Sequence, residues 1–169
     1  MHWQIRTSES APRSSVRRTG MPVPVPAQRQ AMTGAAAGYS GTPLARKLGF
    51  KSGARVAVLD GPDDYRSLLD PIPEDVRFDA RPTAKTDLVH VFVTEREALT
   101  GHLTRLRRLL RPDATLWISW PKRSSRVATT VTEDVVRELA LPLGWVDVKV
   151  CAVTATWSGL KLVVRKELR

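Results

Sequence analysis

The sequence has few of the residues from which covalent and metal-bound scaffolds are built. Its 169 residues include one cysteine, Cys151, and three histidines. A single cysteine excludes an intramolecular disulfide framework and a cysteine-based zinc site, and the histidines lack the spacing of metal ligands. No apolar run approaches the ~18 residues of a membrane-spanning helix, and no apolar signal segment follows the early charges. We therefore expect a cytoplasmic protein with no metal site and no membrane span.

The motifs of several enzyme classes are also absent. The chain has no P-loop, no G-x-S-x-G nucleophile elbow and no H-E-x-x-H zinc motif. No histidine is paired with Cys151 in the sequence, so a thiol nucleophile is not indicated. These absences favour a protein without a catalytic dyad or triad.

What the chain does have is an excess of positive charge. Its formal net charge is +10, and arginine outnumbers lysine 20 to 7. Such a balance favours contact with polyanions such as nucleic acid or anionic lipid. An arginine-rich composition with abundant alanine, valine, glycine and proline is also typical of a GC-rich coding sequence. The total charge alone therefore does not identify a binding surface.

Residues 1–37 differ from the rest in composition. They carry five arginines and one glutamate, a net +4, and a Pro-Val-Pro-Val-Pro segment at 22–26. Without a helical or strand period, they cannot bury enough apolar surface to offset the entropy lost on ordering. We predict a disordered basic tail, part of which is untranslated if Met21 or Met32 is the start; a nucleic-acid-binding arm is the alternative. One domain should span residues 38–169.

From residue 38 onward, apolar strands alternate with helices. Thr42 as N-cap and Pro43 at the first helical position predict a helix over 43–48. The box Thr130-x-x-Glu133 predicts the start of a helix that runs to about residue 140. The other expected helices are 63–69 and 95–110. The expected strands are 54–59, 76–78, 88–93, 114–120, 146–153 and 160–165, with a turn at 157–159 between the last two.

This order of elements predicts the fold class. Strands that are apolar throughout and alternate with helices are typical of a mostly parallel sheet covered on both faces. Right-handed crossovers then give a doubly wound α/β fold of the Rossmann-like type. The last two strands add a C-terminal antiparallel hairpin.

Three places in the chain resemble the core of class I S-adenosylmethionine-dependent methyltransferases. The helix and strand at 99–120 look like the late half of that fold, and the hairpin at 145–166 looks like its antiparallel strand pair. Asp79 ends the second strand, where such enzymes carry an acid for the ribose hydroxyls. The resemblance implies S-adenosylmethionine as a cofactor and Asp79 as one of its ligands.

A closer resemblance rests on several short segments. They are Gly-Tyr-Ser-Gly-Thr-Pro-Leu-Ala-Arg-Lys-Leu-Gly (38–49), Trp-Pro-Lys-Arg-Ser-Ser (120–125), Thr-Glu-Asp-Val-Val-Arg-Glu (132–138), Val-Asp-Val-Lys-Val-Cys-Ala-Val (146–153) and Trp-Ser-Gly-Leu (157–160). These segments are similar to an uncharacterised actinobacterial family, domain of unknown function thirty-fifty-two. The resemblance implies the fold and a domain boundary at residue 38, and it leaves the function open.

The turn after the first predicted strand departs from the cofactor-binding pattern. A dinucleotide or S-adenosylmethionine site needs glycines there, so that the backbone approaches the ligand. This turn is Leu-Asp-Gly-Pro-Asp-Asp (59–64), with one glycine, a proline and three carboxylates. The carboxylates would repel a pyrophosphate, although Asp60 or Asp63 could meet the positive groups of adenosylmethionine. The alternative is a helix N-terminus stabilised by acidic side chains.

The polar loop at 120–130 is the strongest candidate for a binding site. It follows the carboxyl end of a predicted central strand, the edge at which open α/β sheets bind ligands. Cations, hydroxyls and a following helix N-terminus indicate an anion site, and residues 105–126 have a net charge of +6. A solvated loop that caps its helix is the alternative. The candidate residues are Asp60, Gly61, Asp79, Trp120, Lys122, Arg123, Ser124, Ser125 and Arg126, with a basic patch of Arg105, Arg107, Arg108 and Arg111.

Other single residues favour structural roles. Cys151 and His90 lie within predicted apolar strands, which indicates core positions, and His102 is expected on a helix surface. Trp120 and Trp157 either stack on a base or cover the core at strand ends.

We therefore expect a non-catalytic binding or regulatory domain with a methyltransferase-like core and no cofactor, which contacts an anionic ligand or a protein partner. Two alternatives stay open. One is an atypical S-adenosylmethionine-dependent methyltransferase, and the other is a nonspecific nucleic-acid binder.

Overall fold

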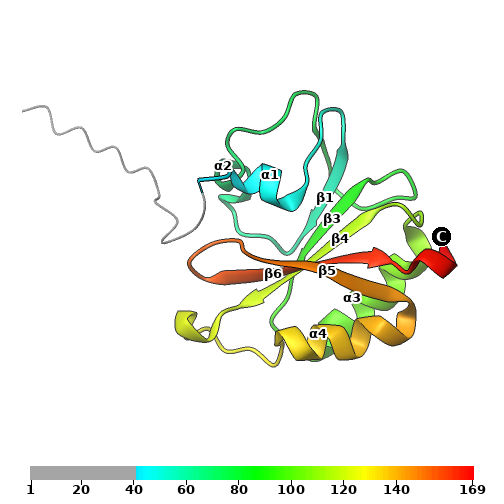
Figure 1. The fold of residues 1–169 in the computed structure, drawn as a ribbon. Coiled ribbons are helices and arrows are strands. Elements are labelled where there is room, and N and C mark those ends of the chain that lie inside the picture. The colour runs from blue at the N-terminus through cyan, green and yellow to red at the C-terminus, as the bar shows by residue number, and fades with distance from the viewer. Residues whose placement is uncertain (1–40) are drawn as a thin grey trace, which may run out of the picture. The chain divides into compact units, whose positions relative to one another are not determined.

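The computed structural model describes residues 41–169, so the predicted tail at 1–37 and the boundary at 38 lie outside the described residues. The helices are α1 (Leu44–Leu48), α2 (Tyr65–Leu68), α3 (Arg96–Leu109) and α4 (Glu133–Ala140), with 3-10 turns η1 (Arg123–Ser125), η2 (Leu141–Leu143) and η3 (Lys166–Leu168). The strands are β1 (Arg55–Leu59), β2 (Arg77–Asp79), β3 (Leu88–Phe92), β4 (Thr115–Pro121), β5 (Trp145–Ala152) and β6 (Trp157–Val164) (Figure 1).

The strands form one sheet in the order β2-β1-β3-β4-β6-β5. Strands β2, β1, β3 and β4 are parallel, and β6 is antiparallel to both β4 and β5. The predicted α/β sheet with its C-terminal antiparallel hairpin is therefore confirmed. The chain goes from β1 to one side at β2 and then returns to the other side at β3. The topological switch point, where such sheets bind ligands, thus lies between β1 and β3.

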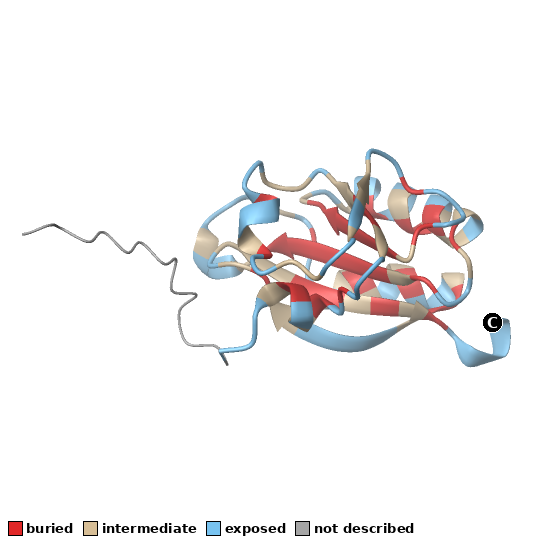
Figure 2. Cartoon of the chain, turned by 90° about the horizontal axis from the view of Figure 1, so that it is seen from above, coloured by how far each residue is buried: buried red, intermediate tan, exposed pale blue. Residues whose placement is uncertain are grey.

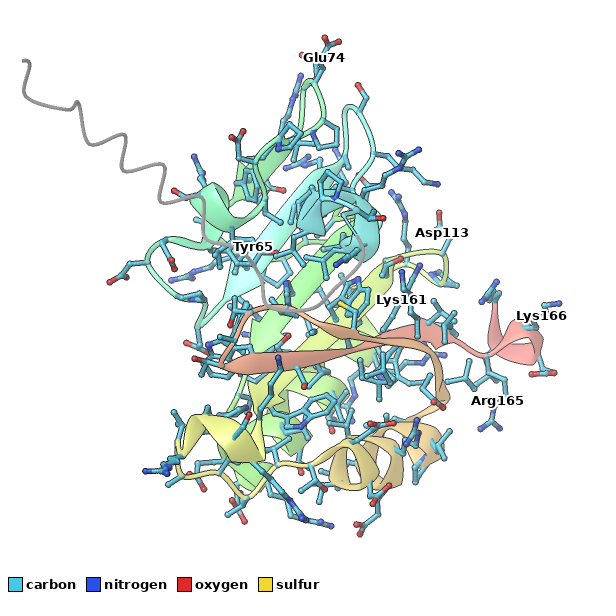
Figure 3. All side chains as sticks on the ribbon, turned by 60° about the vertical axis from the view of Figure 1, so that its left-hand side comes forward. Tyr65, Glu74, Asp113, Lys161, Arg165 and Lys166 are labelled. Carbon is cyan, nitrogen blue, oxygen red and sulfur yellow. The ribbon has the colours of Figure 1, made fainter. Side chains whose placement is uncertain are left out.

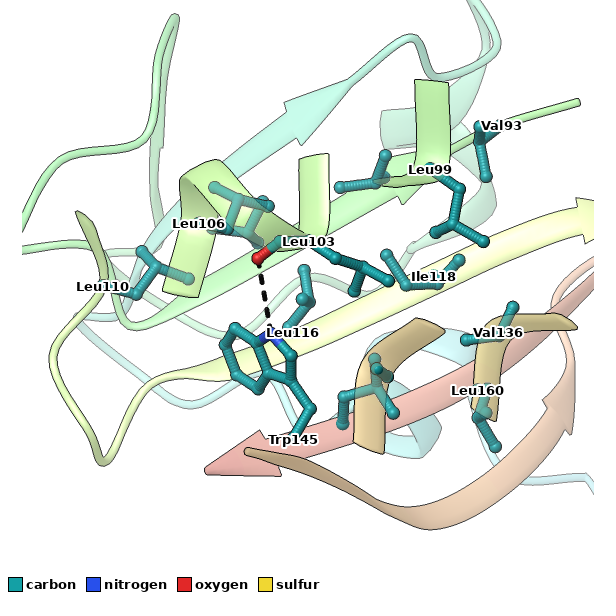
Figure 4. Packing of buried hydrophobic residues seen from close by; sticks show 14 of the residues in the cluster. Val93, Leu99, Leu103, Leu106, Leu110, Leu116, Ile118, Val136, Trp145 and Leu160 are labelled. Atoms are coloured by element: carbon teal, nitrogen blue, oxygen red, sulfur yellow. Dashed lines mark hydrogen bonds between the residues drawn. The ribbon is translucent and has the colours of Figure 1, made fainter. Parts of the chain in front are cut away.

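One face of the sheet packs against α3 and α4. Leu99, Leu103 and Leu106 form one stripe of α3, and Leu110 continues it directly after the helix ends. All four are buried in one cluster with residues of β3 and β4. Trp145, at the start of β5, is fully buried, and its indole N–H donates to the carbonyl of Leu103 at 3.4 Å. Figure 4 shows this indole below the α3 stripe, beside Leu116. Because most of this contact is apolar, burial of the leucine stripe is the main force that fixes α3 against the sheet.

The opposite face is covered by the short helices α1 and α2. Leu48 of α1 is fully buried, and its carbonyl accepts a hydrogen bond from the Trp117 indole at 2.8 Å. Tyr65 and Leu69 bring α2 onto the same cluster. In Figure 2 the buried strands run through the middle of the molecule, between these two layers.

The connection from β2 to β3 is short. Residues 80–87 form turns without a helix, and Thr86 is fully buried with its hydroxyl accepting from the Thr83 N–H at 2.8 Å. Asp87 ends the connection and accepts from the Arg55 N–H at 2.7 Å. The connection therefore runs from the carboxyl end of β2 to the amino end of β3, beside the start of β1.

The predicted starts of all four helices between residues 41 and 169 were wrong. Helix α2 begins at Tyr65, two residues late, which leaves Asp63 and Asp64 outside its first turn, and α3 begins at Arg96, one residue late. Helix α1 begins at Leu44, and Pro43 occupies its N-cap position without a side-chain cap. Helix α4 is capped by Thr132, whose hydroxyl accepts from the Val135 N–H at 3.3 Å, and not by the box at Thr130. The Thr130 hydroxyl instead accepts from the Arg96 N–H at 2.8 Å, at the start of α3. The Thr130 hydroxyl, which the sequence pattern predicts as the cap of α4, thus bonds to the start of α3 instead.

The predicted hairpin turn was also misplaced. Residues 157–159 belong to β6, and the turn is at 153–156. Gly159 is buried within the strand, where an added Cβ would lie 3.0 Å from Val153 and 3.1 Å from the Ser119 hydroxyl. The glycine therefore allows close packing and does not mark a turn. None of the helices between residues 41 and 169 has the length and apolar character to cross a membrane.

Candidate functional site

The carboxyl ends of β1 and β3 define the edge at which a ligand is expected. Asp60 follows β1 with a φ of 54°, a left-handed conformation that is uncommon outside glycine. Its carboxylate lies 3.5 Å from His102 Nε2 of α3, and the side chain of His102 is 20% exposed. Burial lowers the pKa of His102, and Asp60 partly offsets that shift. His102, expected on the helix surface, thus forms an acid–base pair at the switch point.

Gly61 is next to this pair, and its backbone packs inward. A Cβ added at Gly61 would lie 2.7 Å from Val58 Cγ1 and 3.4 Å from the Phe92 ring. The glycine is therefore explained by packing of the turn against β1 and β3, and the space beside it is filled by the protein's own side chains.

Asp79 is engaged by a neighbouring strand. Arg55 donates from Nε to Asp79 Oδ2 at 2.9 Å and from a terminal nitrogen to Oδ1 at 3.0 Å. The side-chain hydrogen bond with Arg55 is the main cause of a lowered pKa at Asp79. Asp79 also pairs in register with Ala57, two residues before the end of β1 at Leu59. Asp79 thus ends β2, and its carboxylate is held in a two-pronged ion pair.

The loop after β4 presents part of the predicted anion site. Arg123, Ser124 and Arg126 are exposed, and Arg126 is in the left-handed region with a φ of 58°. Among residues 41–169, no carboxylate forms an ion pair with Arg123 or Arg126. Lys122 donates to the Thr154 carbonyl at 2.6 Å, and the Ser125 hydroxyl donates to the Lys122 carbonyl at 2.6 Å. Lys122 and Ser125 thus shape the loop, and the other three side chains face solvent.

Trp120 lies elsewhere. It is only 7% exposed and belongs to the apolar cluster beneath α3 and α4. Of its two predicted roles, the structure favours that of a core residue.

The four arginines of the predicted basic patch do not share one role. Arg105 and Arg108 are exposed and line a shallow hollow of about 560 Å³ on the outer side of α3. Arg107 donates to the Leu143 carbonyl at 3.1 Å, and its guanidinium lies 6.0 Å from the centre of the Trp145 ring. Arg111 pairs with Asp87, and its Nε lies 2.8 Å from Asp113 without hydrogen-bond alignment. Only the first two are available as a surface.

A buried hydrogen-bond chain joins α2 to the two central strands. His90 is fully buried, with Nδ1 2.8 Å from the Tyr65 hydroxyl and Nε2 2.7 Å from the Ser119 hydroxyl. Burial lowers the pKa of His90 to about 3 and raises the pKa of Tyr65. His90 is therefore a neutral core histidine, as predicted, and its ring also stacks on Phe92 at 4.4 Å. Its two partners were not predicted.

Cys151 is half-buried rather than a full core residue, and burial raises the pKa of its thiol. No three histidine, cysteine or acidic side chains of the described residues are grouped so that they could hold a metal ion.

Several solved structures have a fold similar to that of this chain. A protein from Sulfolobus solfataricus assigned to the type 11 methyltransferases matches 73% of this chain and 90% of its own, with 14% identity and a TM-score of 0.53. A SAM-dependent methyltransferase from Aquifex aeolicus matches 72% and 87%, with 15% identity and a TM-score of 0.53. A possible exported protein from Bordetella parapertussis matches 72% and 66%, with 12% identity and a TM-score of 0.52.

The chain therefore has the Rossmann-like fold of class I S-adenosylmethionine-dependent methyltransferases. At these identities the likeness concerns the fold and not the activity. No family model matches the chain, and no curated protein matches it.

Proposed function

We propose that this chain is a non-catalytic binding domain on a methyltransferase-like core, and that its ligand or protein partner presents an anion to the Lys122–Arg126 loop. The observation that carries the proposal is the ion pair between Arg55 and Asp79. The acid that would receive the ribose of a cofactor is already held at both oxygens. The turn at Gly61 is likewise filled by Val58 and Phe92. Both features count against S-adenosylmethionine as a ligand, so we derive no reaction step from it.

The exposed side chains of Arg123, Ser124 and Arg126 support the second half of the proposal. They follow β4 at the carboxyl edge of the sheet, and two are cations without an ion-pair partner in the described chain. Charged guanidinium groups and a hydroxyl are suitable donors to a carboxylate or phosphate. An acidic patch of a protein partner fits them as well as a small anion does.

The cofactor half is tested by titrating the full chain with S-adenosylmethionine and S-adenosylhomocysteine in a calorimeter. We expect no binding heat and no rise in melting temperature, because a ligand that binds only the folded state must raise it. Binding that disappears in Asp79→Asn would overturn the proposal in favour of a methyltransferase.

The anion half is tested by an NMR titration with sodium sulfate at constant ionic strength. We expect amide shifts centred on residues 123–126 that are lost in Arg123→Ala/Arg126→Ala. The control is Arg46→Ala/Arg81→Ala, which removes two exposed arginines on other elements. Equal losses in both variants would indicate a general charge effect and contradict the loop as a site.

The second candidate is an atypical S-adenosylmethionine-dependent methyltransferase. The observation in its favour is the Asp60–His102 pair at the switch point, since an acid–base pair in a partly buried edge could move a proton. It predicts cofactor binding by the wild-type chain, so the calorimetric titration separates the two functions.

A nucleic-acid-binding role rests on the exposed Arg105 and Arg108 of α3. It predicts an affinity for single-stranded DNA that falls steeply with salt.

We also propose, from the segments quoted in the sequence analysis, that the chain belongs to domain of unknown function thirty-fifty-two. A cytoplasmic location is part of the same proposal.

A further inference from the structure

The lysines of this chain gather on one face of the molecule. Although arginine outnumbers lysine 20 to 7, five of the seven lysines lie on or beside the α1, β5 and β6 surface. They are Lys47, Lys51, Lys122, Lys149 and Lys161. A coding bias toward arginine would scatter the few lysines without preference for one face. We call Lys51, Lys149 and Lys161 the lysine patch.

The contacts of Lys149 and Lys161 show how closely the patch is built. The two residues are directly opposed across the antiparallel pair β5–β6. Side chains at such positions have Cβ atoms about 5 Å apart. Lys149 donates to the Lys47 carbonyl at 3.3 Å, and Lys161 Nζ lies 4.0 Å from the position that a Cβ would take at Gly49. Both ammonium groups therefore converge on the last turn of α1, and Figure 3 shows Lys161 on this side of β6.

Like charges in this arrangement repel one another. Burial lowers the pKa of Lys161, and Lys149 and Lys51 lower it further, with no acid among the causes. None of the three patch lysines forms an ion pair with a carboxylate of residues 41–169. Directly opposed like charges destabilise a strand pair. The arrangement thus lowers the stability of the free protein, as binding residues commonly do.

We propose that the lysine patch binds a small oligophosphate, with Lys51, Lys149 and Lys161 each contacting phosphoryl oxygens. Lys51 lies two residues after Gly49, which Lys161 approaches, and Lys149 is opposed to Lys161. The three ammonium groups on this surface match a ligand that carries several negative charges in a short length. Lysine binds phosphate as a compact point charge, whereas planar carboxylates are matched better by arginine. The lysine patch shares no residue with the proposed anion site at Lys122–Arg126, and its test does not depend on the proposed function.

The experiment is a calorimetric titration of the full chain with inorganic tripolyphosphate and, in a second arm, with ATP. The test variant is Lys51→Gln/Lys161→Gln. The control is Lys85→Gln/Lys166→Gln, which removes the same charge from the two lysines outside the surface; Figure 3 shows Lys166 on the C-terminal turn. We expect the test variant to lose at least about tenfold in affinity and the control to change by less than about twofold.

The two arms distinguish the source of the phosphates. Equal affinity for tripolyphosphate and ATP indicates recognition of the phosphate chain, and tighter binding of ATP indicates that the nucleoside also contributes. Either result supports the proposal if the binding is lost in Lys51→Gln/Lys161→Gln.

Three outcomes would overturn the proposal. They are no binding of either ligand at about 0.15 M salt, equal losses in the test and control variants, and a single-stranded DNA competitor that binds the patch more tightly than tripolyphosphate does. The melting temperature of the free test variant provides a second readout. It should equal or exceed that of the wild type because a repulsion is removed, whereas a lower value would indicate that the lysines only stabilise α1.

Discussion

The two faces of the sheet are both buried, but by different chemistry. Beneath α3 and α4 the contact is made by a cluster of buried apolar side chains, among them Leu99 and Val164. Beneath α1 and α2 the sheet carries the hydrogen-bond chain of Tyr65, His90 and Ser119, and farther along that face the lysine patch. The difference teaches that a long amphipathic helix can be held mainly by burial of its apolar stripe. The short helices, with little apolar area, are positioned by specific polar contacts as well.

The largest effect is expected on the apolar face. Leu103→Ala removes a fully buried side chain from the middle of the α3 stripe. Because the surrounding helix and strands can collapse only in part, we expect a loss of about 2–5 kcal/mol in the free energy of unfolding. Urea unfolding at neutral pH measures it. A loss below about 1 kcal/mol would contradict the view that apolar burial is the main force holding this face.

On the polar face, stability should depend on pH through His90. Its pKa is 6.5 in the unfolded chain and about 3 in the folded protein. The unfolded state therefore takes up a proton as pH falls below about 6.5, which the folded state does not accept, and stability is lost. Between pH 7 and pH 5 we expect this group to cost about 2 kcal/mol.

The measurement is urea unfolding of the wild type and His90→Gln at several pH values. The variant is less stable throughout, so the informative quantity is the slope of its stability against pH, which should be flatter. Parallel slopes would mean that His90 exchanges protons in the folded protein as it does in the unfolded one.

A smaller effect is expected at the end of the same chain. Tyr65→Phe keeps the ring against His90 and Phe92 and removes the hydroxyl that contacts His90 Nδ1. Since the histidine nitrogen is then left buried without a partner, we expect a loss of about 1–3 kcal/mol. Ser119→Ala, which removes the partner of Nε2, is the matched variant. If neither variant changes the urea midpoint, α2 is held by its apolar contacts alone.

Most of the fold could be predicted because its signals are local. The apolar runs at β3 and β4 and the leucine stripe of α3 need no knowledge of their partners. The start of α4 could not be predicted, since Thr130 and Thr132 are both plausible caps. Which of them caps the helix depends on the Arg96 N–H, which lies 34 residues away.

The candidate site was less predictable because it depends on pairings between distant residues. Nothing in the sequence shows that Arg55 reaches Asp79, 24 residues later, or that His102 faces Asp60. The exposed cations of the 123–126 loop were predictable from their place after an apolar strand. The register of β5 and β6, which opposes Lys149 to Lys161, appears only once the position of the hairpin turn is known.

The position of β6 between β4 and β5 has a consequence for the order of assembly during synthesis. Strand β5 is made first, but it joins the sheet only through β6, the last strand of the chain. Until β6 leaves the ribosome, on the order of seconds after β4 at ordinary elongation rates, the hydrogen-bonding edge of β4 has no strand to cover it. The nascent domain thus passes through a stage in which its central sheet is open on one side, and a stop within the last strand would leave it there.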